Sequence, residues 1–160
     1  MIQTINSHAD LITRFYTAFA ARDVEAMVAC YHPDCMFMDP VFGRLNHDEV
    51  CAMWRMLDER GKDLAITFEK VEADEGSGSA HWEAIYTFSK TGRKVHNKID
   101  AQIGFLDGLI LAHRDRFDFY AWTKQALGPM GVLLGWSPLV QNKIRKEARK
   151  SLDAFMKREN

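Results

Sequence analysis

Four side chains are acidic or polar in stretches that are otherwise apolar. Asp39 lies in the run FMDPVFG, directly before a proline, and Asp100 lies in NKIDAQIGF. His113 and Asp115 fall on the apolar side of LILAHRDRFDF. An isolated buried carboxylate is costly unless it is paired or protonated, and burial raises its pKa. A carboxyl of this kind therefore needs a partner, a cavity or a functional role.

Each acid also has a structural interpretation. An aspartate before proline often begins a turn and accepts hydrogen bonds from its own backbone, which would explain Asp39. Asp115 has His113 and two arginines beside it as partners. Alternation along the strand places Asp100 on the face opposite Ile99 and Ala101, whereas a β-bulge would turn it inward. The sequence leaves these alternatives open.

The first half of the chain predicts the helices that must position these side chains. Apolar residues recur at spacings of three and four over residues 5–23, which indicates an amphipathic helix with Ser7 as N-cap. A second helix over 23–34 should stop before Pro33, because proline disfavours the α conformation in the preceding residue. A short strand over 35–42 follows, then a third helix over 46–60 that ends at Gly61.

The second half predicts strands and then a different kind of tail. Stretches 64–74, 79–90, 94–107 and 109–122 are rich in β-branched and aromatic residues and are separated by turn signals, so we expect an antiparallel meander. Residues 125–138 form a connector punctuated by glycine and proline. Residues 139–157 form an amphipathic helix, and from Pro138 onward there are seven basic and three acidic residues. This helix either contacts an anionic membrane surface or docks on its own domain or a partner subunit with its basic face in solvent. We expect one α+β domain, with its main body at 1–122 and a helical extension of the same domain at 123–160.

Composition excludes several classes of protein. The chain has 160 residues, 21 basic and 22 acidic, and this balance does not create the positive field that attracts nucleic acid. The three cysteines form no CxxC pair, and the first residues lack a signal-peptide pattern, so we expect a reducing, cytoplasmic location. We expect no integral membrane contact, no metal site and no cofactor, because no long apolar run, metal-ligand spacing or phosphate-binding loop is present.

Together, the helices LITRFYTAFAARD and DVEAMVACYHPD, the run FMDPVFG and the later GRKVHNKIDAQIGF resemble the nuclear transport factor 2-like fold. Within it they resemble the ketosteroid isomerases and SnoaL-like polyketide cyclases. The resemblance covers about residues 8–120. It implies a cone of three N-terminal helices on a curved, mostly antiparallel sheet, followed here by a C-terminal helical extension.

The resemblance also implies roles for particular residues. In the isomerases, the aspartate of an Asp-Pro pair is the general base, and a tyrosine and a protonated aspartate hold the oxyanion. Asp39 and Asp100 match the two carboxylate positions, while Phe15 occupies the position of the tyrosine. Tyr16 follows directly, and one residue rotates about 100° around a helix, so we expect it to point elsewhere.

A second resemblance, to the limonene-epoxide hydrolases, rests on KID followed by HRDRFD. It places Lys98, Asp100 and Asp115 where those enzymes orient and activate a water. Lysine lacks the bidentate fork of arginine, so this substitution is not conservative.

We therefore expect a cofactor-independent protein that moves a proton on a small hydrophobic carbonyl compound. Asp39 would be the base, and Asp100 or Asp115, with His113, would donate to the developing enolate. Alternatives are a non-catalytic module that binds a small ligand, and the hydrolase. The expected substrate-binding residues are Phe15, Phe19, Trp54, Trp82, Tyr86 and Asn97.

Two further expectations concern assembly and access. We expect a homodimer formed through the outer face of the sheet, where Ile85, Ile110, Ala112 and Tyr120 should lie. The segment GPMGVLLGW has glycines that free the backbone, so we expect it to close over the wide end of the cone as a lid.

Overall fold

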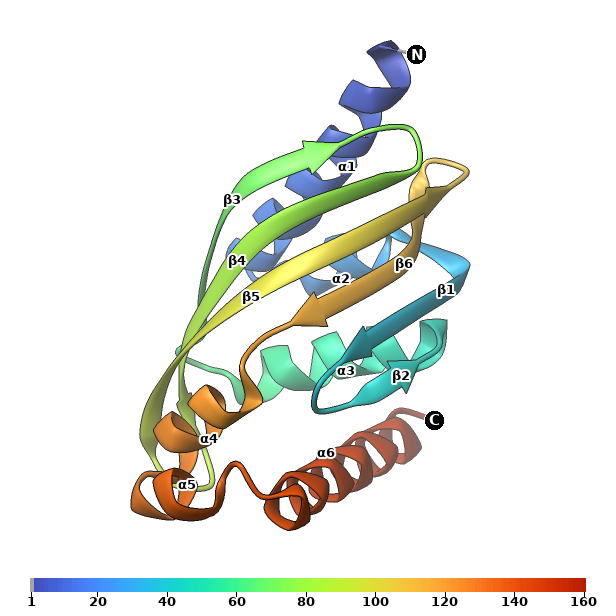
Figure 1. The fold of residues 1–160 in the computed structure, drawn as a ribbon. Coiled ribbons are helices and arrows are strands. Elements are labelled where there is room, and N and C mark those ends of the chain that lie inside the picture. The colour runs from blue at the N-terminus through green and yellow to red at the C-terminus, as the bar shows by residue number, and fades with distance from the viewer. Residues whose placement is uncertain (1) are drawn as a thin grey trace.

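A curved sheet of six strands organises the molecule (Figure 1). The computed structural model describes the backbone of residues 2–160 and side chains from Ser7 onward. The strand order is β2-β1-β6-β5-β4-β3. The strands are β1 (Tyr31–Asp39), β2 (Gly43–Leu45), β3 (Ala65–Ala73), β4 (Ser77–Phe88), β5 (Arg93–Leu106) and β6 (Leu109–Arg116). Strands β3 to β6 form the predicted antiparallel meander, and β1 runs parallel to β6.

Helices cover one face of this sheet and extend beyond its end (Figure 1). The helices are α1 (Ile2–Ala20), α2 (Val24–Val28), α3 (His47–Arg60), α4 (Phe119–Leu127), α5 (Pro129–Leu134) and α6 (Pro138–Glu159). The first three lie behind the sheet in Figure 1, while α6 runs below α3 and packs against it. The predicted α+β fold, with its helical extension, is confirmed. The boundary expected at residue 122 falls inside α4, which packs on β5.

The third helix begins and ends where the sequence predicts. The Asn46 side chain accepts a hydrogen bond from the Glu49 backbone N–H, and the Glu49 carboxylate accepts one from the Asn46 N–H, both at 3.0 Å. This capping box satisfies two backbone donors that the first turn leaves unpaired. Gly61 caps the other end and donates its N–H to the Leu57 carbonyl at 2.8 Å.

Two predicted helix ends were wrong. Helix α1 already includes Ser7, so that residue is not its N-cap. Helix α2 ends at Val28, and Pro33 lies inside β1 rather than after a helix. The strand tolerates Pro33 because its pairing with β6 is irregular between Tyr31 and Met36, where a missing N–H removes no ladder bond.

The predicted last strand was too long. Strand β6 ends at Arg116, and the Asp118 side chain accepts a hydrogen bond from the Ala121 N–H at 3.0 Å, which caps α4. The aromatic residues that follow therefore enter a helix despite their β propensity. The predicted connector is also mostly helical, because it contains the end of α4 and all of α5.

The outer face of the sheet differs in two positions from the expected dimer surface. The register shifts between Gly104 and Phe105, and Ile110 turns into the core, with no exposed surface. Tyr120 belongs to α4. Ile85 and Ala112 stay exposed on the outer face, and the homodimer remains a prediction.

Two apolar clusters form the core. The main cluster fills the space between the sheet and the first three helices, and the second, smaller cluster contains Val95, Phe119, Trp122 and Ala126. Tyr86 and Phe117 pack against both clusters. Within the described part of the chain, no helix has the length and apolar character needed to cross a bilayer.

Candidate functional site

Asp39 is the last residue of β1 and forms a tight turn with the residues after Pro40. Its Oδ1 accepts hydrogen bonds from the Val41 N–H at 2.9 Å and the Phe42 N–H at 2.6 Å. These bonds are the turn interaction that the sequence allows. Phe42 packs against the main apolar cluster and Val41 against the second, so the Asp39 carboxyl lies where the two clusters meet.

The surroundings of this turn make Asp39 a weak acid. Burial raises its pKa to about 7, the backbone N–H of Phe42 opposes that rise, and the negative charge of Asp115 adds to it. A carboxyl with a pKa near neutrality is present both as an acid and as a base at physiological pH. Asp39 therefore combines a structural bond with the proton affinity expected of a general base. We call the surrounding half-buried group the junction; it consists of Asp39, Val41, Phe42, Tyr86 and Phe117.

A chain of buried hydrogen bonds crosses the interior beside the junction. The Trp54 indole N–H donates to the Tyr31 hydroxyl at 3.0 Å, and that hydroxyl lies 2.8 Å from His113 Nδ1. His113 Nε2 lies 2.9 Å from Asp115 Oδ1. Because an indole only donates, the Tyr31 hydroxyl accepts from Trp54 and has its own proton to give; a bond from it to His113 Nδ1 leaves Nε2–H as the donor to Asp115. The direction of every bond then leads to Asp115.

Asp115 is buried and well partnered. Its Oδ1 accepts from His113 and, at 3.3 Å, from the Trp82 indole N–H, while only 4% of its side chain is exposed. These hydrogen bonds explain how an acidic side chain can be buried on an apolar strand face.

Whereas the Phe15 ring packs on Tyr31 and His113, Tyr16 points in another direction, as expected, and its ring packs on Phe68 and Trp82. Its side chain has no exposed surface, and among the described residues its hydroxyl is the one buried side-chain polar atom without a hydrogen-bond partner. Burial, followed by the charge of Asp115, raises the pKa of Tyr16 well above its ordinary value. The hydroxyl therefore stays protonated and has a proton to donate. Both Phe15 and Tyr16 face inward because the curved sheet covers a broad sector of α1.

The expected substrate-binding residues divide into two groups. Phe15, Phe19, Trp54 and Trp82 belong to the packed main cluster, with ring centroids 5.1 Å apart for Phe19 and Trp54. Tyr86 and Asn97 are half-buried on the inner face of the sheet. The Tyr86 hydroxyl accepts a hydrogen bond from the Trp122 indole at 2.7 Å. Of the predicted set, Tyr86 and Asn97 remain partly open to solvent, as the junction does.

Asp100 is not brought to this site. It is exposed on the outer face of β5 and lies 2.8 Å from His81 Nδ1, because the strand has no bulge before Gly104. Lys98 is also exposed on that face. Asp115 lies on the inner face, so the three residues that match the epoxide hydrolases do not meet.

Tyr31 is a functional candidate that the sequence analysis did not single out. It lies on the same side of β1 as Cys35 and Phe37, and all three are buried. Alternation counted back from Asp39 would have placed it on the inner face.

Helix α6 covers the turn that holds Asp39. Arg145 Nε donates to the Pro40 carbonyl at 2.9 Å, and the guanidinium lies 5.1 Å from the centre of the Phe119 ring. The predicted lid was the segment 128–136, but α5 packs on α4 and leaves most of its apolar side chains exposed. The element over the junction is therefore α6.

Comparisons with known proteins identify the family and the fold. A family model described as a SnoaL-like domain matches residues 12–113. No curated protein sequence matches the chain.

Three solved structures share the fold at low identity. A candidate SnoaL-like polyketide cyclase from Jannaschia has a TM-score of 0.68 at 12% identity, over 78% of this chain and 94% of its own. An epoxide hydrolase of Mycobacterium tuberculosis, similar to the limonene-epoxide hydrolases, has a TM-score of 0.62 at 17% identity, over 83% and 98%. A protein with a ketosteroid isomerase-like fold from Catenulispora acidiphila has a TM-score of 0.64 at 11% identity, over 74% and 93%.

The predicted resemblance to the ketosteroid isomerase-like fold is confirmed. Identities this low establish the fold alone, whereas the family match runs from α1 to the strand that carries His113. Since that match spans more than half of the sequence, the chain belongs to the SnoaL-like domain family.

Proposed function

We propose that this protein is a cofactor-independent enzyme of the ketosteroid isomerase-like or polyketide cyclase-like type. It would transfer a proton on a small hydrophobic carbonyl compound. The observation that carries the proposal is Asp39, a half-buried carboxyl whose pKa is raised to about 7 at the junction of two apolar clusters. Removing a proton next to a carbonyl group requires a base that is ionised at working pH and still has proton affinity, and Asp39 has both properties.

The enolate formed by that step needs hydrogen-bond donors for its oxygen. Tyr16 offers a buried hydroxyl with no partner among the described residues, and its raised pKa keeps the proton in place. Asp115 lies in the same interior, where His113 and Trp82 fix its orientation by hydrogen bonds to Oδ1. Donors that are fixed before the reaction stabilise developing charge at little reorganisation cost. Tyr16 would thus supply the donor that Phe15 cannot.

The surroundings define the class of substrate. Phe42 and Phe117 present apolar surface beside Asp39, while Tyr86 and Asn97 add few polar groups. A substrate that fits would be small and mostly apolar, with one carbonyl group to be held by hydrogen bonds. Helix α6 would limit its size, because Arg145 holds the helix against the Asp39 turn.

Asp39→Asn tests the base with a matched control. Asparagine keeps the oxygen that accepts from Val41 and Phe42 but cannot take a proton. We expect enzyme-catalysed exchange of α-hydrogens of hydrophobic ketones in deuterated water, followed by NMR, to fall by roughly 10²–10⁴-fold. The melting temperature should change little. In the parent protein, exchange should rise with pH through about 7, the pKa of the base.

Asp74→Asn is the control because Asp74 makes the same local bonds elsewhere. Its Oδ1 accepts from the Gly76 N–H at 2.9 Å and the Ser77 N–H at 2.8 Å, but the residue is exposed. These backbone bonds hold the pKa of Asp74 below its ordinary value. We expect this variant to exchange ketone hydrogens as the parent does. Equal rates for all three proteins would refute the role of Asp39.

A binding module is the second candidate, and the turn bonds of Asp39 favour it. Oδ1 already has a structural task, so the acid does not require a catalytic explanation. Apolar ketones would then bind with equal affinity to the parent and to Asp39→Asn, and neither protein would accelerate exchange. Calorimetric titration beside the exchange assay separates the two functions.

A further inference from the structure

An apolar segment after α4 is exposed to an unusual degree. We call residues 130–139 the apolar tip. It contains six of the nine large hydrophobic side chains that are strongly exposed in the described part of the chain. Their exposed fractions are 60% for Met130, 51% for Val132, 70% for Leu133, 49% for Leu134, 62% for Trp136 and 80% for Leu139. A contiguous apolar surface of this kind marks an interaction site.

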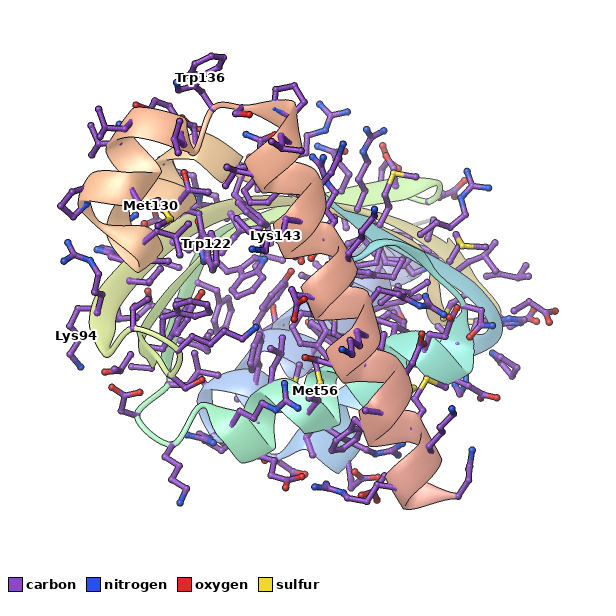
Figure 2. All side chains as sticks on the ribbon, turned by 90° about the horizontal axis from the view of Figure 1, so that it is seen from below. Met56, Lys94, Trp122, Met130, Trp136 and Lys143 are labelled. Carbon is purple, nitrogen blue, oxygen red and sulfur yellow. The ribbon has the colours of Figure 1, made fainter. Side chains whose placement is uncertain are left out.

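The tip projects from the protein instead of lining a groove. Gly131 approaches the Thr123 carbonyl so closely that a Cβ at that position would lie 1.9 Å from its oxygen. The absence of a side chain at Gly131 therefore allows α5 to pack directly against α4. The next three residues are all exposed although each is rotated by about 100° from the last, so most of the helix circumference is uncovered. Figure 2 looks onto α5 and α6 and shows Trp136 pointing away from the rest of the protein.

The carbonyl groups in the middle of the tip are paired within the protein. Every carbonyl from Gly131 to Gly135 accepts a hydrogen bond from within the protein. The donors are the Gly135 N–H to Gly131 at 2.8 Å, the Tyr120 hydroxyl to Val132 at 2.7 Å, the Trp136 indole to Leu133 at 2.9 Å, the Ser137 N–H to Leu134 at 2.9 Å and the Gln141 amide to Gly135 at 2.9 Å. The carbonyls at a helix end normally bind solvent, and an apolar environment requires that they be paired internally.

Positive charge surrounds the tip. From Phe119 to Lys146 the sequence has four basic residues and no acidic one. Lys124 lies 4.7 Å above the Tyr120 ring, whose hydroxyl binds α5. Lys143, Lys146 and Lys150 are exposed along α6, and over the part of the chain that the structure describes they make no ion pair.

We propose that this surface binds anionic phospholipid membranes from one side. The apolar tip inserts among the upper acyl chains, and the lysines of α6 and Lys124 contact acidic headgroups. Buried apolar area and attraction to anionic lipid together determine the strength of such binding. A second copy of this chain fits the surface less well, because a symmetric contact would place the lysines of both copies near each other.

Vesicle sedimentation tests the proposal. The full chain should sediment with vesicles of equimolar phosphatidylcholine and phosphatidylserine, and much less with vesicles of phosphatidylcholine alone. The double variant Leu133→Ser/Leu139→Ser should bind the mixed vesicles at least about tenfold more weakly, because each leucine contributes its own transfer free energy. Lys143→Gln/Lys146→Gln/Lys150→Gln should weaken binding to the mixed vesicles and reduce its dependence on salt.

Matched controls exclude a general effect of lost apolar area or charge. Ile85→Ser/Leu106→Ser removes two exposed apolar side chains elsewhere, and Lys62→Gln/Lys98→Gln removes two exposed lysines. Both controls should bind like the parent. Failure of the parent to sediment with the mixed vesicles, or equal binding by tip and control variants, overturns the proposal. A parent dimer that Leu133→Ser/Leu139→Ser dissociates, without vesicle binding, assigns the tip to a second copy instead.

Discussion

The two faces of the sheet each carry a chain of histidines and carboxylates, but in opposite surroundings. On the inner face, the His113 side chain has no exposed surface and that of Asp115 has 4%. On the outer face, His81 lies 2.8 Å from both Asp100 and Glu83, and His96 Nε2 lies 2.6 Å from Glu83. There the Asp100 side chain is 76% exposed. The same chemical groups therefore occupy a dry site and a wet one.

Solvent makes the consequences of these two chains different. Water screens the outer charges, and each group can find a new partner in solvent if its neighbour is lost. In the interior, a donor or acceptor that loses its partner bears the full desolvation penalty. The inner chain should therefore fix orientations, and the outer chain should respond to pH.

Removing His113 from the inner chain of hydrogen bonds should have the largest effect on stability. His113→Phe leaves the Tyr31 hydroxyl without its acceptor and Asp115 without its closest donor. We expect the free energy of unfolding to fall by about 3–5 kcal/mol, as when one partner of a buried pair is removed. His81→Phe on the outer face should cost less than about 1 kcal/mol. Urea denaturation of both variants gives the comparison, and equal losses would contradict the contrast between the faces.

Removing a single hydroxyl group from the inner chain of hydrogen bonds should give an intermediate loss of stability. Tyr31→Phe removes one hydroxyl, so the Trp54 indole N–H and His113 Nδ1 both lose their partner. The expected decrease in stability is about 1–3 kcal/mol, because two buried polar atoms stay unpaired while the ring still packs. The same urea titration measures it. A stability equal to that of the parent would show that this series of hydrogen bonds does not stabilise the interior.

The outer chain should give the smallest effect, visible as a pH dependence. Hydrogen bonds first to Asp100 and then to Glu83 raise the pKa of His81 from 6.5, and hydrogen bonds to His81 and then His96 lower the pKa of Glu83 from 4.5. A raised histidine pKa stabilises the folded state below 6.5, and this contribution is lost as pH rises through the folded value. A lowered glutamate pKa stabilises it above 4.5 and is lost as pH falls.

The two contributions overlap between about pH 4.5 and 6.5. The difference in stability between the parent and His81→Gln should therefore be largest in that window and smaller at pH 8. Taking the difference in stability between the two proteins cancels the contributions of the other titrating groups, including Asp39. A difference that is constant from pH 5 to 8 would show that the outer chain does not hold the charged histidine.

The sequence predicted the inner and outer faces through alternation, and it succeeded where the register is regular. His113 and Asp115 point inward as expected, and Asp100 follows simple alternation outward. It failed for Ile110, because one extra residue in β6 between Ile110 and Ala112 reverses the side that Ile110 occupies relative to His113 and Asp115. Such a shift depends on how two strands pair, which neither strand specifies alone.

The sequence predicted candidate acidic residues for the site but not how their surroundings are arranged. The raised pKa of Asp39 depends on apolar residues from α4 and the sheet that no local pattern brings to the turn. The same turn bonds at Asp74 leave a lowered pKa, so the turn motif itself does not decide the proton affinity. Helical rotation predicted that Tyr16 points in another direction than Phe15, but not that both are fully buried, because the width of the buried sector depends on the curvature of the sheet.

Parallel pairing of β1 with β6 has a consequence for the order in which the protein is made. The strand that ends in Asp39 leaves the ribosome early, but its parallel neighbour β6 is the last strand of the meander to be synthesised. The contact from Arg145 to Pro40 joins residues 105 positions apart and forms later still. Contacts this distant in sequence slow folding, because the loop must close before they form. We therefore expect Asp39 to gain its completed surroundings late in folding, and a nascent chain without its C-terminal helix lacks the Arg145 contact that closes them.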